Sequence, residues 1–325
     1  MSGRLQSVGA LGIALLVACT PEQSAEEQPA LEPVVVYAAY KDRVYLPALF
    51  EGYTKETGVD VIVRYGAAPG IVDDVIDSRV SPTADLLLVP SVAEIWRAAE
   101  EGALRPIYSE FVQDSVPTWL RDPDEYWVAL SYRSAVLVYD PDVVRVDALS
   151  SYEALAEAQF RDRVCLSSAS LKINRAVIAM LIGELGVRDA ELVVRAWVAN
   201  LAMPTFETEE KLIRAVQSGD CAIGIVSSQA AALAAQSIED SRFEIFTPAA
   251  NYSDIDGIGI ARHARNPNGA LALLEWLLSK KIQTQHASQT NVHAAIGAAI
   301  GTKNVALVAR HSEEAQKLAE RARYR

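Results

Sequence analysis

Apolar residues in the first third of the chain alternate between two spacings. Short continuous apolar runs indicate buried strands, and between them apolar side chains recur at helical spacing. The predicted strands lie at residues 34–37, 59–63 and 85–89, and the predicted helices at 46–57, 71–78 and around 95–101. This succession predicts βαβ units and a mostly parallel sheet.

The pattern restarts after residue 140, which indicates a second lobe. Residues 127–139 contain two extended apolar runs separated by the polar segment 131–134, and we place the crossing between the lobes there. In the second lobe the predicted helices lie at 150–160, 174–185, 189–201 and 208–218, and the strands at 164–166 and 221–225. Ser150 and Glu153 have the spacing of a capping box at the start of the first of these helices.

The last part of the chain returns to the first lobe through a strand at 258–261 and a helix at 268–280, before an amphipathic helix near the C-terminus. The fold class is therefore α/β with two lobes, each a mostly parallel sheet flanked by helices. Lobe 1 comprises residues 34–138 and 257–305, lobe 2 comprises 139–256, and 306–325 form a C-terminal helix.

The N-terminal residues have the pattern of a bacterial lipoprotein signal. Arg4 precedes an apolar stretch at 8–18, and Leu-Val-Ala closes this stretch directly before Cys19. We expect residues 1–18 to be removed and Cys19 to carry the lipid, with 19–33 as a flexible tether on the periplasmic side of a membrane. An uncleaved anchor is the alternative, but the stretch is shorter than the roughly 20 residues of a spanning helix.

Charge and cysteine content restrict the partners and the compartment. The 325 residues carry a formal net charge of −12, which disfavours nucleic acid because such partners need clustered Lys and Arg. Besides Cys19 there are Cys165 and Cys221, each in an apolar strand. In an exported protein this pair is a candidate disulfide, and two unpaired buried thiols are the alternative.

Signs of catalysis are lacking in the sequence. The four histidines are scattered, without metal-ligand spacing, and no nucleophile elbow or phosphate-binding loop occurs. We therefore expect no enzyme activity. Polar residues do follow three predicted strands, where open α/β sheets place ligands, although helix capping would explain them equally well. They are Tyr40, Lys41 and Asp42 after the first strand, the serines at 167–170 after the strand at 164–166, and Ser227, Ser228 and Gln229 after the strand at 221–225.

Several segments in their order along the chain resemble the iron(III)-type periplasmic solute-binding proteins of ABC importers. They are residues 34–37, 50–58 (FEGYTKETG), 82–85, 95–102, 127–134, 163–166, 218–221, 257–260 and 266–267. The resemblance covers about residues 34–300. It implies the class II periplasmic-binding-protein fold, with two lobes joined by a hinge, a monomer, and an ABC permease in the inner membrane as partner.

At the positions where this family binds iron, the sequence departs from the family's pattern. The adjacent tyrosines of the ferric members correspond to Gln229 and Ala230, the histidine to Lys41, and a further tyrosine to Ile173. Because Fe(III) favours phenolate oxygens, these replacements argue against bare Fe(III) as ligand, and no other cofactor is expected. Tyr40, Asp42 and Tyr132 could still bind a metal in another arrangement.

Other cleft residues point to a different solute. Arg133 matches a family arginine beside the cleft, and Ser170 and Asn174 correspond to positions that face it. We expect an anion, a polar organic molecule or a metal chelate to be captured between the lobes by hinge closure. The alternative is that the fold serves as a sensor or an interaction partner of a membrane complex, without transport.

Overall fold

The computed structural model describes residues 1, 3, 31–40, 45–77, 83–238, 241–250, 252–298 and 305–325. Glu32–Arg325 form a single unit. The predicted signal segment, the lipidated Cys19 and most of the predicted tether lie outside the described residues, as do Lys41 and Asp42. Among the helices that are described, none combines the length and the apolar character needed to cross a membrane.

The first sheet is built on three early strands. β1 (Val34–Ala38) lies between β2 (Val61–Tyr65) and β3 (Leu86–Val89) and runs parallel to both. All five residues of β1 are buried, which explains why its sequence is a continuous apolar run. The late strand β9 (Ser253–Ala261) lies next to β3 in the sheet, and the short strand β4 (Leu104–Arg105) pairs with β9.

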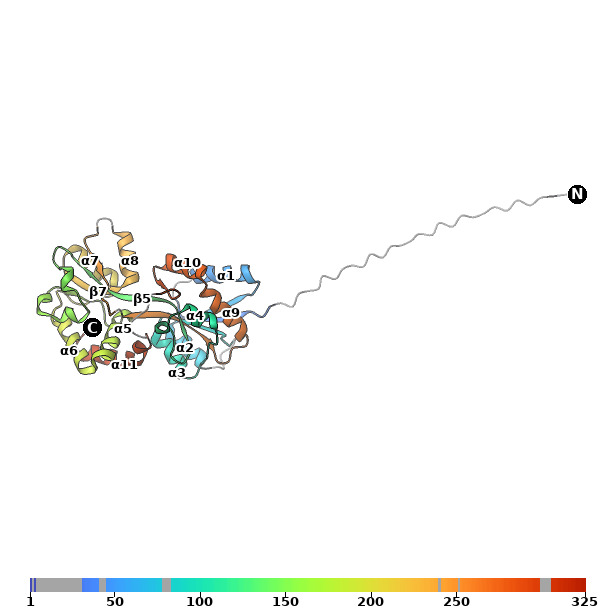
Figure 1. Cartoon of the computed structure of the whole chain (residues 1–325), viewed down its shortest axis with the longest axis horizontal. Coiled ribbons are helices and arrows are strands. Elements are labelled where there is room, and N and C mark those ends of the chain that lie inside the picture. Colours follow the sequence, from blue (N-terminus) through green and yellow to red (C-terminus); the bar gives the residue numbers. More distant parts are fainter. Residues whose placement is uncertain are drawn as a thin grey trace. The chain divides into compact units, whose positions relative to one another are not determined.

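The strand β5 (Val128–Tyr139) joins this sheet to a second one (Figure 1). Its residues up to Ser134 pair with β9, and its residues from Ala135 pair with β7 (Ile223–Ser227). Three short strands complete the sheets: β10 (His293–Ala294) and β8 (Glu244–Phe246) pair with β5, and β6 (Val164–Cys165) pairs with β7. The chain thus passes from one sheet to the other between Ser134 and Ala135.

The two sheets are mixed, which corrects the prediction that each is mostly parallel. Among the strands of the described residues, β1 pairs parallel with β2 and β3, and β6 with β7, whereas β9 and β5 pair antiparallel with their neighbours. A buried apolar run identifies a strand but carries no information on its direction or its neighbours. The chain returning from the second lobe inserts β9 in the direction opposite to β3.

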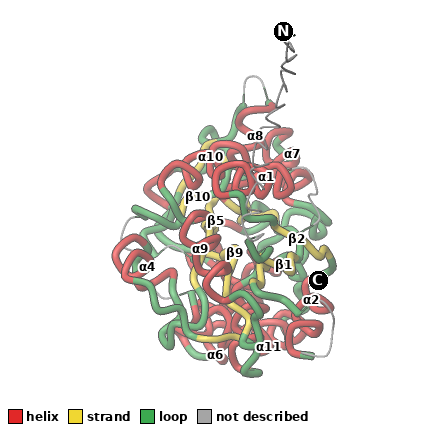
Figure 2. The backbone as a smooth tube through the Cα atoms, turned by 90° about the vertical axis from the view of Figure 1, so that its right-hand side faces the viewer, coloured by secondary structure: helices red, strands yellow, loops and turns green. Residues whose placement is uncertain are grey.

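Helices cover the sheets on both sides, so that the strands lie inside a layer of helices (Figure 2). The α-helices are α1 (Tyr45–Thr57), α2 (Ala68–Ile76), α3 (Val92–Glu100), α4 (Glu110–Ser115), α5 (Lys172–Leu185), α6 (Val187–Ala199), α7 (Glu209–Ser218), α8 (Ser228–Ser237), α9 (Pro267–Leu277), α10 (Lys280–Thr290) and α11 (Ala306–Arg321). α7 shows how the sequence sets such limits. Thr208 Oγ1 accepts a hydrogen bond from the Lys211 amide at its start, and Gly219 ends it with a left-handed φ of 82°.

The helix predicted at 150–160 is wrong. Short 3₁₀ helices occupy this part of the chain: η2 (Val146–Ala148), η3 (Glu153–Ala156) and η4 (Ala158–Phe160), with η1 (Thr118–Leu120) earlier in the chain. Side chains at the end of α6 bind the carbonyl groups that an α-helix would use. Trp197 Nε1 donates to Tyr152 O, and Asn200 Nδ2 donates to Leu155 O and Glu157 O.

Two features tie distant segments together. A disulfide joins Cys165, at the end of β6, to Cys221, just before β7, with the Cα atoms 5.9 Å apart. The C-terminal helix α11 packs against α5 and α6 of the second lobe and also against α3 of the first. Arg310 of α11 lies over the ring of Trp96 on α3, with its guanidinium carbon 5.3 Å from the ring centroid.

Candidate functional site

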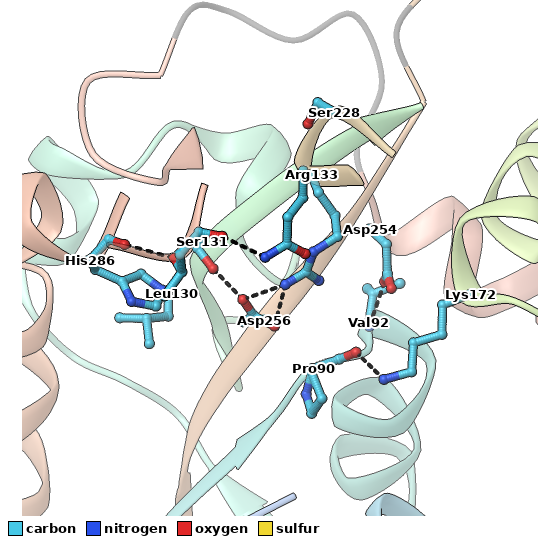
Figure 3. Close-up of polar contacts among 12 residues, drawn as sticks. Pro90, Val92, Leu130, Ser131, Arg133, Lys172, Ser228, Asp254, Asp256 and His286 are labelled. Carbon is cyan, nitrogen blue, oxygen red and sulfur yellow. Dashed lines mark hydrogen bonds and ion pairs between the residues drawn. The ribbon is translucent and has the colours of Figure 1, made fainter. Parts of the chain in front are cut away.

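A buried ion pair joins the two long central strands (Figure 3). Arg133 on β5 places Nη2 3.0 and 2.9 Å from the two carboxylate oxygens of Asp256 on β9. The hydroxyl of Ser131 donates to the same carboxylate. The side chains of Arg133 and Asp256 are 17% and 2% exposed, so the pair is largely removed from water.

The surroundings keep this pair ionised. Burial raises the pKa of Asp256, but the charge of Arg133 and the hydrogen bonds from Ser131 and Arg133 outweigh burial and lower this pKa. Burial lowers the pKa of Arg133, and the carboxylates of Asp256 and Asp254 more than compensate and raise it. The pKa of Asp254 is raised by its burial, and one of its oxygens accepts a hydrogen bond from the Val92 amide at 3.1 Å.

A cavity of about 390 Å³ opens beside the ion pair. Its walls come from the first lobe, through α1, β5, β9 and α10, and from the second lobe, through α8. Residues lining it include Tyr40, Arg133, Gln229, Asp256 and His286. This size and this mixed lining are typical of a small-molecule site.

Several polar groups at the cavity have no hydrogen-bond partner among the described residues. They are the Tyr40 hydroxyl and both ring nitrogens of His286, all of which are buried. Arg133 uses only Nη2 for Asp256, which leaves its Nε and Nη1 donors without a partner in the described part of the chain. Burial, followed by the charge of Asp256, raises the pKa of Tyr40, so its phenol keeps its proton. The uncommitted groups are therefore mainly donors.

Two direct hydrogen bonds in the described part of the chain join residues of the second lobe to residues of the first. Lys172 Nζ, at the start of α5, donates to Pro90 O at 2.6 Å, and burial lowers the pKa of this lysine. Gln229 Nε2 donates to Thr290 O at 2.6 Å. These contacts hold residues of the second lobe against the first around the cavity.

The structure brings together three of the residues predicted for the site and separates three others. Tyr40, Arg133 and Gln229 line the cavity. Ser170 instead lines a different cavity, of about 440 Å³, beside α11. The two remaining predicted residues have structural partners: Asn174 Nδ2 donates to the backbone and hydroxyl of Ser167, and Ser227 Oγ accepts from the Ala230 amide as the N-cap of α8.

Three of the four positions aligned with the family's iron ligands, Ile173, Gln229 and Ala230, are described by the structure. Ile173 is 4% exposed and packs in the hydrophobic core, while Gln229 and Ala230 lie in the first turn of α8. In the described part of the chain, no group of three or more His, Cys, Asp or Glu side chains is placed to hold a metal ion.

Among the cavity residues that sequence reasoning missed are Asp256 and His286. A signal for Asp256 was present, because Asp254 and Asp256 interrupt an apolar strand, and buried carboxylates in a strand need partners. His286 lies on α10, a helix with few apolar residues that the pattern did not predict.

Comparisons with known proteins agree with this architecture. The Iron uptake protein A1 of Synechocystis sp. is 29% identical over 249 residues, which cover 72% of this chain and 68% of that protein. A putative 2-aminoethylphosphonate-binding periplasmic protein of Salmonella typhi is 24% identical over 252 residues, covering 75% and 72%. A Trichodesmium protein solved in complex with iron and citrate ligands has a TM-score of 0.81 at 26% identity, covering 90% of this chain and 100% of that one.

These similarities confirm the predicted two-lobed periplasmic-binding-protein fold and the resemblance to the iron(III)-type proteins. A family model described as bacterial extracellular solute-binding protein matches residues 48–320. Since this match spans most of the sequence, the chain belongs to the family of bacterial extracellular solute-binding proteins.

Proposed function

We propose that this protein is the extracytoplasmic binding component of an ABC importer, and that it captures a small polar solute between its lobes without transforming it. The family match and the relatives named for periplasmic binding support this role. We also propose that it works as a monomer, that Cys19 anchors it by a lipid to the membrane, and that the closed form docks on a permease.

The observation that carries the proposal is the surplus of uncommitted donors at a cavity shared by both lobes. Arg133 offers Nε and Nη1, and Tyr40 offers its hydroxyl, while the Asp256 carboxylate is already bound by Arg133 and Ser131. Buried polar groups are rarely left without partners. A solute with acceptor oxygens would supply them, as in a carboxylate or a phosphonate.

The same groups suit bare Fe(III) poorly. A hard trivalent cation needs anionic oxygen ligands, and neither Tyr40 nor Asp256 in the described lining of the cavity suits this role. The phenol of Tyr40 has a raised pKa, and the negative charge of Asp256 is balanced by Arg133. Among the iron-containing solutes that the relatives' names suggest, a ferric chelate whose own carboxylates face Arg133 fits better than the ion alone.

Hinge closure is the mechanism we propose for capture. The hydrogen bonds from Lys172 to Pro90 and from Gln229 to Thr290 link opposite sides of the cleft, and they would break if the lobes separated. A solute that bridges the lobes would add to these contacts and shift the population towards the closed form.

The test is a thermal-shift titration of the purified protein. The solutes are ferric citrate, citrate, ferric ion with carbonate, and 2-aminoethylphosphonate. A ligand at 100 times its Kd adds about 2.7 kcal/mol of stability, which raises the melting midpoint measurably. Stabilisation by citrate, ferric citrate or the phosphonate supports the proposal. Stabilisation by ferric ion alone would overturn the chemistry proposed for the solute, and no stabilisation at all would favour an interaction partner over a transport protein.

A further inference from the structure

His286 is a buried histidine that makes no hydrogen bond to the ion pair of Arg133 and Asp256. It lies on α10, is 5% exposed, and has no hydrogen-bond partner for Nδ1 or Nε2 among the described residues. Its ring stacks on that of Tyr45, with centroids 5.2 Å apart, which holds the imidazole in one orientation. A buried imidazole without partners has lost its hydrogen bonds to water, which costs free energy unless another group replaces them.

The position of His286 indicates which group would replace these hydrogen bonds. The residue lines the same cavity as Arg133 and Tyr40, on the wall formed by α10. The charged groups that act on its ring are Asp256 on β9 and Arg133 on β5, and the Tyr45 ring on α1 stacks on it. Asp256 and Arg133 neutralise each other, so the imidazole meets a cavity with little net charge.

We infer that His286 is a solute-contacting residue, whose imidazole donates a hydrogen bond to an oxyanion of the bound solute and takes up a proton from solvent on binding. This inference rests on the proposed function, and it specifies the solute as one that carries a carboxylate or phosphonate oxygen within reach of both Arg133 and His286.

The electrostatics give the direction of the proton linkage. In the free protein, the pKa of His286 is lowered, mainly by burial. Asp256 raises this pKa and Arg133 lowers it, but the effect of burial is larger than either. The ring is therefore neutral at pH 7. An oxyanion placed against the ring favours its protonated form and raises this pKa in the complex. Binding is therefore accompanied by proton uptake, and affinity rises as pH falls from 7.5 towards the pKa that His286 has in the unliganded protein.

The experiment measures affinity and proton uptake by calorimetry with citrate and 2-aminoethylphosphonate as separate probes, between pH 5.5 and 7.5. The wild-type chain is compared with His286→Gln, and His293→Gln serves as the matched control. His293 lies nearby on β10, where its ring is 4.9 Å from that of Tyr132, and it does not line the cavity. Each probe's own titration is common to all variants, so differences between variants isolate the histidine.

We expect His286→Gln to weaken binding of the effective probe roughly tenfold or more at pH 6, and to abolish the extra proton uptake. His293→Gln should change neither quantity. Wild-type affinity and proton uptake in His286→Gln would overturn the inference while leaving the proposed function intact. Absence of binding by the wild-type chain would remove both. Should His286→Gln fold poorly, NMR titration of the His286 ring in the wild-type chain decides: a pKa that citrate or the phosphonate leaves unchanged would also overturn the inference.

Discussion

Replacing Arg133 with methionine keeps most of its bulk but leaves the buried Asp256 carboxylate without its cationic partner, while the hydrogen bond from Ser131 remains. The two side chains are 17% and 2% exposed, so water can replace the guanidinium only in part. Removing one partner of a buried ion pair costs about 3–5 kcal/mol. Because the Ser131 hydrogen bond remains, we expect the lower end of this range, about 3 kcal/mol, in the free energy of unfolding at pH 7.

The loss in free energy of unfolding caused by Arg133→Met should decrease as pH falls. In the wild-type chain, Arg133 and Ser131 overcome the effect of burial and lower the pKa of Asp256, so its ionised form stabilises the fold at neutral pH and loses this effect as pH falls through the folded pKa. In Arg133→Met, the charge that lowers the pKa of Asp256 is lost, while burial still raises this pKa. We therefore expect the pKa of Asp256 in the folded variant to lie above its value in the unfolded chain. The carboxyl group then takes up a proton on folding, so the gap between the two proteins narrows towards about pH 4.

Urea unfolding at pH 7 and pH 5 measures this difference. Arg214→Met is the matched control, because it breaks an ion pair with Glu210 whose side chains are 70% and 72% exposed, and such a pair contributes about 0–1 kcal/mol. Adding Asp256→Asn to Arg133→Met should recover part of the lost stability, since no buried charge is left. If Arg133→Met costs no more than Arg214→Met, or if the gap widens on acidification, the assignment of a tightly coupled buried pair is refuted.

Two further predictions concern the second sheet. Replacing Cys165 and Cys221 with serine opens a loop of sequence separation 56, and the chain-entropy relation gives a loss of about 4 kcal/mol, measured by urea unfolding of the double variant beside the oxidised wild type. Gly224→Ala places a Cβ 2.8 Å from Cys165 O and 2.6 Å from a Leu212 methyl group, so we expect a loss of about 1–3 kcal/mol. Gly52→Ala, whose Cβ meets nothing closer than 3.8 Å, should not destabilise, and equal effects at the two glycines would contradict the packing described here.

Elements whose limits are set by local chemistry could be predicted from the sequence. The helix predicted at 208–218 agrees with α7 because Thr208 caps its first turn and Gly219 ends it. The segment predicted as a helix at 150–160 failed because its carbonyl groups are taken by Trp197 and Asn200, more than 40 residues away. A capping-box spacing depends on neighbouring residues alone and carries no information on hydrogen bonds from side chains so far along the chain.

The candidate site could likewise be predicted only where local sequence specifies it. Arg133, Tyr40 and Gln229 follow or interrupt predicted strands, and the structure brings them to one cavity. The partner of Arg133 is 123 residues away on β9, and no local pattern specifies that β9 would lie beside β5. His286 was missed because neither the helix that carries it nor the lost hydrogen bonds of a buried ring leave a mark on the sequence.

The insertion of β9 beside β3 also sets the order in which the molecule can assemble. β3 is complete by residue 89, yet the strand that pairs with its free edge is Ser253–Ala261. A chain growing from its N-terminus cannot complete the first sheet until the whole second lobe has been made. Such long-range pairing is slow to form and leaves strand edges open meanwhile. The first sheet is therefore expected to be completed after all strands of the second sheet have been made, although it begins first in the sequence.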